Sequence, residues 1–302
     1  HGAGGGGAAV SMASDRKNHG PTMPGVYAIP EPNAYRCPVE HCRDACDLTC
    51  MKIGFRMLDM QWAGAPAAVI AEPILSAGGV IVPPEGYFKA LRQECEARGL
   101  MLIFDEAQTA FGRVGEWFAA DGLGVTPDIM AVSKTLGGGI PLAATITSDA
   151  IEETAYQRGF SHYTSHVSDP LPAAVGVAVL QTIESENLIE RSKEMGGYLR
   201  ERMLDLQQKH QVIGDVRGQG LLIGVELVED RETRVPYHKL GARTTERCLE
   251  LGLSMNIRRR PERGSVWRIA PPLTVTRDEI DTATAILDQA LGESLDAMAR
   301  EC

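Results

Sequence analysis

Two short apolar runs that end in polar, chemically useful residues decide the expected fold: residues 100–106 read LMLIFDE and residues 129–134 read IMAVSK. Continuous apolar runs of this length are typical of strands buried on both faces of a parallel sheet. In such sheets, ligands bind beyond the carboxyl ends of the strands. We therefore expect Asp105 and Lys134 to meet at one ligand-binding edge.

The rest of the chain alternates apolar runs with helical periodicity, which predicts an α/β fold with a mostly parallel sheet. Further strands are expected at 67–71, 143–147, 221–227, 253–257 and 266–269, and helices at 87–98, 170–184, 187–209, 241–252 and 277–300. Because strands replace helices after the long stretch 187–209, we expect a domain boundary near residue 190. The predicted domains are 1–190 and 191–302.

A carboxylate and a lysine at one sheet edge could hold a cationic heterocyclic cofactor. The carboxylate would keep a ring nitrogen protonated, and the lysine would bind a carbonyl carbon as an imine. An aspartate at a strand end also serves as a turn or helix cap, and most lysines are solvated surface charges. The two residue types alone leave both interpretations open.

Composition excludes several functional classes. The 302 residues carry 40 acidic and 30 basic side chains, a net charge of −10, which argues against general binding to nucleic acids or anionic membranes. No window approaches the roughly 18 uninterrupted apolar residues of a membrane span. The sequence opens without a recognisable signal peptide, so the cytoplasm is the default expectation.

Four of the seven cysteines, Cys37, Cys42, Cys46 and Cys50, lie close together. If this segment were helical, the last three would share one face and could hold a soft metal. Structural zinc sites more often use CxxC pairs on turns, so small buried or partly exposed thiols are the favoured interpretation. A metal site and a disulfide remain as alternatives.

Three stretches carry a resemblance to a known family: residues 103–113 (IFDEAQTAFGR), 127–129 (PDI) and 133–143 (SKTLGGGIPLA). Together they closely resemble the class III, fold-type-I aminotransferases, which depend on pyridoxal phosphate (PLP). Within that family the likeness is greatest to 2,2-dialkylglycine decarboxylase, through residues 71–76, 165–176, 253–257 and 268–275. The resemblance extends over essentially the whole chain.

The resemblance implies a PLP-binding large domain over residues 1–190, incomplete at its N-terminus, and a small α+β C-terminal domain over residues 191–302. It also implies a homodimer, or a dimer of dimers, with shared active sites. The partners would be a small amino acid and a 2-oxo acid such as pyruvate, with no nucleic acid and no membrane.

The resemblance also assigns roles to four side chains. Lys134 would bind PLP covalently and shuttle a proton, and Asp105 would pair with the pyridinium nitrogen, whose charge stabilises the released electrons. Gln108 would hydrogen-bond the phenolic oxygen of the cofactor. Arg268 would clamp the substrate carboxylate, since a guanidinium suits a bidentate contact.

A further stretch that resembles the decarboxylase bears on the cofactor phosphate and on an ion. Ser165 would reach the PLP phosphate of the neighbouring subunit, in place of the family's usual threonine. Backbone oxygens of Ser165 and Val167 and the carboxylate of Asp169 would hold an alkali ion, K+ or Na+, which prefers hard oxygen ligands. Taken alone, His162, His166 and Asp169 suggest a transition-metal site, but single histidines usually have structural partners.

Residues 218–224 (GQGLLIG) superficially match a dinucleotide fingerprint. The third glycine comes one position late, and the segment precedes a strand instead of following one. We therefore reject a nicotinamide-binding function and expect this segment to lead into the C-terminal domain.

The beginning of the chain departs from the family pattern. His1 and Gly2 align with a His-Gly pair that follows the aromatic residue stacked on PLP, so that aromatic and the phosphate-binding turn before it are expected to be missing. The glycine run 4–7 then reads as family sequence more than as a linker. We expect a truncated enzyme that decarboxylates and transaminates 2,2-dialkylglycines with pyruvate as acceptor. An ordinary class III aminotransferase, a related lyase and a non-catalytic fragment are the alternatives.

Overall fold

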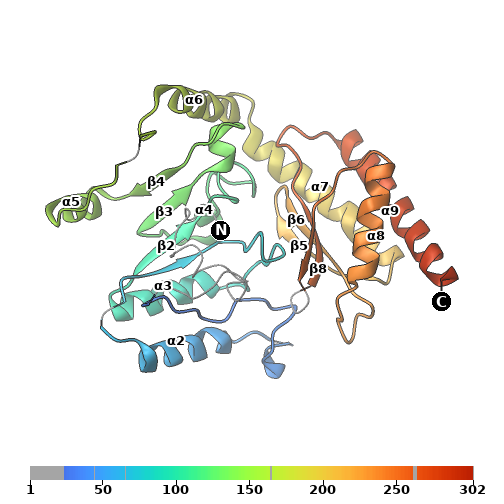
Figure 1. Cartoon of the computed structure of the whole chain (residues 1–302), viewed down its shortest axis with the longest axis horizontal. Helices are drawn as coiled ribbons and strands as arrows, with labels where there is room; N and C mark the ends of the chain where they lie inside the picture. Colours follow the sequence, from blue (N-terminus) through green and yellow to red (C-terminus); the bar gives the residue numbers. More distant parts are fainter. Residues whose placement is uncertain (1–23, 44, 65, 164, 261–263, 302) are drawn as a thin grey trace. The chain divides into compact units, whose positions relative to one another are not determined.

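The computed structural model describes residues 24–43, 45–64, 66–163, 165–260 and 264–301. The expectations about His1, Gly2 and the glycine run lie outside these residues. The chain forms two compact units (Figure 1). The first contains the described residues up to Pro73, Pro83–Phe111 and Glu116–Glu186; the second contains Ile74–Val82, Gly112–Gly115 and the chain from Asn187 onward. The domain assignment with a boundary near residue 190 stays a prediction.

The first unit is built on a four-stranded, mostly parallel sheet in the order β1-β2-β3-β4. Its strands are β1 (Ala68–Ala71), β2 (Met101–Asp105), β3 (Ile129–Val132) and β4 (Ala144–Thr147). β1, β2 and β3 run parallel, whereas β4 is antiparallel to β3. All four predicted strands of this region are present, so the expected α/β fold is confirmed.

Helices of the first unit are α2 (Thr49–Gln61), α3 (Tyr87–Arg98), α4 (Ala119–Leu123), α5 (Asp149–Gln157) and α6 (Pro170–Ser185). α3 ends where the sequence predicts, at Gly99, whose φ of 66° is the left-handed conformation that glycine adopts without strain. Its N-cap is Gly86, so Glu85 lies before the first turn. Phe88 of α3 packs edge-on against Phe104 of β2, with ring centroids 5.0 Å apart.

The cysteine-rich segment is not the continuous helix that would align three thiols. A short 3-10 helix, η2, covers Glu40–Arg43, and α2 begins only at Thr49. Cys42 and Cys50 are buried and Cys46 is exposed, and all three are free thiols. The helical metal ladder considered from the sequence is therefore wrong, and the described cysteines form no disulfide.

The second unit contains an antiparallel sheet in the order β5-β6-β8-β7. The strands are β5 (Ile213–Gln219), β6 (Leu222–Leu227), β7 (Ile257–Arg260) and β8 (Gly264–Ile269). Every residue of β6 is buried. The predicted strand 253–257 is wrong apart from its last residue. β5 was not among the predicted strands, because its two glycines obscure the apolar pattern.

Three helices complete the second unit: α7 (Leu188–Lys209), α8 (His238–Glu250) and α9 (Arg277–Arg300). They lie beside the β5–β8 sheet in Figure 1. α9 starts with a capping box, in which Thr276 and Glu279 satisfy each other's backbone donors. Among the described helices, none combines the length and apolar character needed to cross a membrane.

The glycines of the false dinucleotide fingerprint have a packing role in the β5–β6 hairpin. Gly220 has a φ of 53°, and a Cβ there would lie 2.5 Å from the backbone of Val114. A Cβ on Gly218, which has a φ of 134°, would lie 2.1 Å from the carbonyl oxygen of Leu222. A hairpin in this position has no helix N-terminus to receive a pyrophosphate, which agrees with the rejected nicotinamide-binding function.

Candidate functional site

The residues singled out by the sequence, Asp105 and Lys134, end neighbouring parallel strands. Asp105 is the last residue of β2 and pairs in register with Ala131 of β3. Lys134 follows the end of β3 by two residues. The backbone N–H of Glu106 donates to the Ala131 carbonyl at 2.9 Å and extends the pairing beyond Asp105. Both side chains therefore start from the carboxyl edge of the sheet, the edge at which open α/β sheets bind ligands.

Asp105 is a buried carboxylate with only 6% of its surface exposed. Its Oδ1 accepts a hydrogen bond from the backbone N–H of Ala107 at 3.1 Å, which holds the side chain in the turn after β2. Burial of an ionisable group in such a position is costly unless charged or hydrogen-bonding partners surround it. A carboxylate held this way suits a cationic partner at the sheet edge.

Lys134 occupies an unusual backbone conformation for its residue type. It begins the short 3-10 helix η3 (Lys134–Gly137) with a φ of 51°, in the left-handed region. A non-glycine residue in this region costs on the order of 1 kcal/mol and is concentrated at functional sites. α6 packs closely behind the following turn, since a Cβ on Gly138 would lie 2.9 Å from Cγ2 of Val179. The lysine side chain itself is exposed.

A second carboxylate, Glu106, fixes the loop that follows Asp105. It is fully buried and accepts hydrogen bonds from Thr109 Oγ1 at 2.5 Å and from the backbone N–H groups of Ala119 and Ala120 at 3.0 and 2.9 Å. Burial raises the pKa of Glu106 above its ordinary value. These bonds join the turn after β2 to the start of α4 and so position the half-buried Gln108 between them.

Sequence reasoning assigned Glu106 no role, because an acidic residue beside a more conspicuous aspartate reads as part of the same motif. The detectable signal was its place between a buried strand and a short helical segment, where a carboxylate can accept backbone N–H groups. Asp105, Lys134 and Gln108 are thus the predicted residues that the structure brings to one region of the first unit.

Arg268 lies in the second unit, on β8, and is half-buried. Its backbone N–H donates to the carbonyl of Asn256 at 2.9 Å, and its Nη1 lies 3.5 Å from Oγ of the buried Ser76. Both contacts are made within the second unit. The predicted contact of Arg268 with a substrate carboxylate stays a prediction.

Ser165 and Val167 lie in an exposed turn that precedes α6. Asp169, the N-cap residue of α6, has its Oδ2 2.8 Å from Nδ1 of His166. Across the described part of the chain, His162 does not converge with this pair on a common ligand position, so a transition-metal site at these three residues is not supported. The predicted contact of Ser165 with a phosphate and the alkali-ion site stay predictions.

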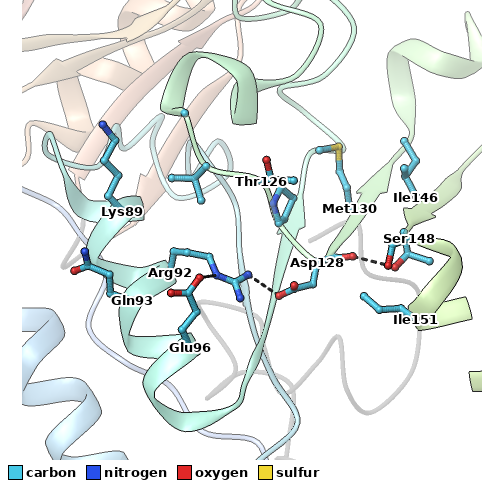
Figure 2. Close-up of a pocket in the computed structure, with 14 residues that line it drawn as sticks. Lys89, Arg92, Gln93, Glu96, Thr126, Asp128, Met130, Ile146, Ser148 and Ile151 are labelled. Atoms are coloured by element: carbon cyan, nitrogen blue, oxygen red, sulfur yellow. Dashed lines mark hydrogen bonds and ion pairs between the residues drawn. The ribbon is translucent and has the colours of Figure 1, made fainter. Parts of the chain in front are cut away.

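A cavity of about 820 Å³ opens at the opposite edge of the sheet, between α3, the start of β3 and the end of β4 (Figure 2). Three of its charged side chains are paired: Arg92 Nη1 lies 2.6 Å from Asp128 Oδ2, and Arg92 Nε lies 2.9 Å from Glu96 Oε1. Asp128 also accepts the backbone N–H of Leu102 at 2.6 Å. These groups brace the amino ends of the strands, away from the edge that carries Asp105 and Lys134.

The chain matches a known protein family over most of its length. The profile of the family described as aminotransferase class-III matches residues 1–291. Curated relatives include an uncharacterized aminotransferase of Schizosaccharomyces pombe, 47% identical over 96% of this chain and 65% of its own. A leucine/methionine racemase of Thermococcus litoralis is 36% identical over 89% of this chain and 59% of its own. An (R)-1-hydroxy-2-aminoethylphosphonate ammonia-lyase of Vibrio splendidus is 34% identical over 94% and 61%.

Solved structures of aminotransferases are also similar to this chain. A Bacillus anthracis aminotransferase superposes with a TM-score of 0.85 and 32% identity, over 92% of this chain and 64% of that chain. An amine transaminase from an uncultivated Pseudomonas species, solved in its PLP-bound form, gives a TM-score of 0.80 and 34% identity over the same shares. The chain spans about three-fifths of the length of the curated relatives named above.

Proposed function

Because the chain belongs to the class III aminotransferase family, we propose that the protein catalyses PLP-dependent transfer of an amino group between an amino donor and a 2-oxo acid. The observation that carries this proposal is the position of a buried carboxylate, Asp105, and of Lys134 at the carboxyl ends of adjacent parallel strands. The aminotransferases among the relatives and solved structures support it.

The side chains at this sheet edge fit the cofactor. PLP is an anionic pyridine with an aldehyde, and it needs a carboxylate at its ring nitrogen and a lysine at its aldehyde carbon. Asp105 is buried and anchored by the Ala107 N–H, and Lys134 is exposed at the same edge. When bound, the cofactor supplies an electron sink for bonds broken at the substrate carbon.

Each residue of the chain then has a defined task. Asp105 keeps a proton on the ring nitrogen, because a preorganised charge in a buried site stabilises developing charge without moving water. The Nζ of Lys134 holds the cofactor and carries a proton to and from the substrate carbon. Gln108 donates to the phenolic oxygen, and Glu106 keeps the Gln108 loop in place through Ala119 and Ala120.

Three assignments rest on the sequence resemblance: Arg268 binds the substrate carboxylate, Ser165 binds a phosphate oxygen, and Ser165, Val167 and Asp169 bind K+ or Na+. The 2.8 Å contact between His166 and Asp169 means that an ion would have to share the Asp169 carboxylate. Partners in this proposal are a small amino acid, a 2-oxo acid and a second copy of the chain.

Decarboxylating transamination of 2,2-dialkylglycines, with pyruvate as acceptor, is the narrower reading. It is supported by sequence likeness at residues 71–76, 165–176, 253–257 and 268–275. The names of the relatives, which include aminotransferases, a racemase and an ammonia-lyase, favour the broader amino-transfer reading. A chain that binds no PLP is the remaining outcome.

The test is to add PLP to the purified chain, reduce with borohydride and map the modified lysine by peptide mass spectrometry. We expect modification of Lys134 in the starting chain and in Lys52→Ala, which removes an exposed lysine of α2 as a matched control. We expect Lys134→Ala to lose it and to lower turnover by about a thousandfold or more.

The reaction products distinguish simple amino transfer from decarboxylating transamination. Amino donors with an α-hydrogen should yield the corresponding oxo acids, and 2-aminoisobutyrate should yield no CO2. Release of CO2 and acetone from 2-aminoisobutyrate would favour the decarboxylase. Modification of lysines other than Lys134, or of none, would overturn the assignment of this sheet edge as the cofactor site.

A further inference from the structure

Three potential metal ligands converge just before α2, apart from the sheet edge described above. His41 Nε2 lies 3.3 Å from Asp47 Oδ2, and Cys42 Sγ lies 3.2 Å from Asp47 Oδ1. The donor atoms of the three residues all lie within 4.8 Å of one another. Among the described residues, no other group of three or more histidine, cysteine, aspartate or glutamate side chains converges in this way.

Two of the distances between these donor atoms are close to those of a tetrahedral zinc site. Zinc bonds of about 2.3 Å to sulfur and about 2.0–2.1 Å to nitrogen and oxygen place N and O ligands about 3.3 Å apart, and S and O ligands about 3.5 Å apart. The observed separations are 3.3 Å between His41 Nε2 and Asp47, and 3.2 Å between Cys42 Sγ and Asp47. Because His41 contacts Oδ2 of Asp47 and Cys42 contacts Oδ1, a rotation of the carboxylate that directs one oxygen to the metal would complete the coordination.

The carboxylate of Asp47 is held in place by Thr49, the first residue of α2. Asp47 Oδ1 accepts the Thr49 backbone N–H at 2.9 Å and the Thr49 hydroxyl at 2.6 Å. Thr49 Oγ1 also lies 3.2 Å from His41 Nε2. Ligands of protein-bound metals are commonly oriented by a second layer of hydrogen bonds such as these.

The mixture of donors indicates which metal suits the cluster. A thiolate, an imidazole and a carboxylate form a set that borderline zinc accepts, whereas calcium and magnesium require oxygen ligands alone. Cys42 is 4% exposed, but the His41 side chain is 61% exposed, so solvent reaches the cluster from one side. That open side leaves room for a water as the fourth ligand.

We propose that His41, Cys42 and Asp47 bind a zinc ion whose fourth ligand is a water molecule. The ion would join η2, which carries His41 and Cys42, to Asp47 just before α2. Since binding requires the folded arrangement, it would stabilise this part of the first unit. The site shares no residue with the proposed cofactor site, so it stands independently of the proposed function.

The test uses the full chain, reduced and freed of metal, titrated with Zn2+ and with Co2+ as a spectroscopic substitute. We expect one equivalent to bind and Co2+ to give the absorption of a tetrahedral thiolate complex. Cys42→Ser should abolish the thiolate-to-cobalt band, and Cys46→Ser, which removes the exposed neighbouring thiol, should leave it unchanged.

Two further variants keep the test decisive if Cys42→Ser fails to fold, as checked by circular dichroism. His41→Gln alters an exposed side chain and should lower the affinity for zinc at least tenfold. Thr49→Val keeps all three ligands and should lower the affinity for zinc about tenfold. This is the range typical when hydrogen bonds that orient metal ligands are lost. A wild-type chain that binds no stoichiometric zinc, a cobalt band that survives Cys42→Ser, or one that Cys46→Ser removes would overturn the proposal.

Discussion

The two units place their buried strands differently. In the second unit, β6 has β5 and β8 as neighbours, and all six of its residues are buried. In the first unit, β4 pairs with β3 alone in the described structure, and all four of its residues are exposed. The second sheet therefore has a strand that is buried along its whole length, whereas burial in the first sheet is concentrated on the inner strands.

Within the first unit, the proposed chemistry lies on the best-buried strand. β2 is flanked by β1 and β3, and it ends at Asp105 with only 6% exposure. Glu106, next in the chain, is fully buried as well. A rigid inner strand thus holds the carboxylate, while the outer strand contributes little burial.

The largest effect is expected at the buried ion pair of the second unit. Arg217 Nη1 lies 2.7 Å from Glu226 Oε2 and 2.7 Å from Asp215 Oδ2, and its guanidinium also donates to the carbonyls of Gly79 and Val80. Arg217→Met removes the cation beside a fully buried carboxylate and should cost about 3–5 kcal/mol. Native-state hydrogen exchange of peptides from β5 and β6 measures the loss.

The matched control is Arg217→Met combined with Glu226→Gln. Because the double variant no longer buries the carboxylate charge, it should recover part of the lost protection. Peptides from β2 and β3 should keep theirs. Equal loss of protection in both sheets would contradict the view that the second unit closes its own core.

The same substitution in the two sheets gives the next largest effect. Ile223 of β6 is 0% exposed and Ile146 of β4 is 44% exposed. Ile223→Ala should destabilise its unit by about 2–5 kcal/mol, since it leaves a cavity in a packed core. Ile146→Ala should cost below about 1 kcal/mol. Unfolding in denaturant, monitored by hydrogen exchange in each sheet, gives the loss of unfolding free energy for both variants. Similar losses at the two positions would contradict the difference in burial between β6 and β4.

The smallest effect concerns an ion pair between two helices of the second unit. Asp288 of α9 accepts from Lys209 Nζ and lies 2.6 Å from His210 Nε2 at the end of α7. Partial burial alone would raise the pKa of Asp288, but the hydrogen bonds from Lys209 and His210 outweigh it and lower the pKa. A lowered folded-state pKa stabilises the protein above the unfolded value of about 3.9 and loses this effect as the pH falls through the folded pKa.

Asp288→Asn should therefore cost about 0.5–1 kcal/mol at pH 7, and the difference from the starting chain should shrink toward pH 3. Unfolding by urea at several pH values measures it. A difference that stays constant, or grows, on acidification would show that the carboxylate charge is not the source of the stabilisation.

Much of the fold was readable from local pattern. Strand β3 and helices α3 and α9 have the predicted bounds, because apolar runs and helical periodicity are strong there and glycine or a capping box marks a helix end. β5 and α5 were not predicted. The glycines of β5 interrupt its alternation, and α5, which has no buried residue, offers no apolar face to detect.

Local pattern and motif are enough to predict the residue types at the two strand ends, the α/β class and the resemblance to the class III family. Three features could be seen only in the folded chain: the register that sets Asp105 opposite Ala131, the hydrogen bonds by which Glu106 holds the start of α4, and the convergence of His41 and Cys42 on Asp47. Each of these features depends on where the backbone turns. The turns are fixed by contacts between residues that no periodic pattern in the sequence identifies.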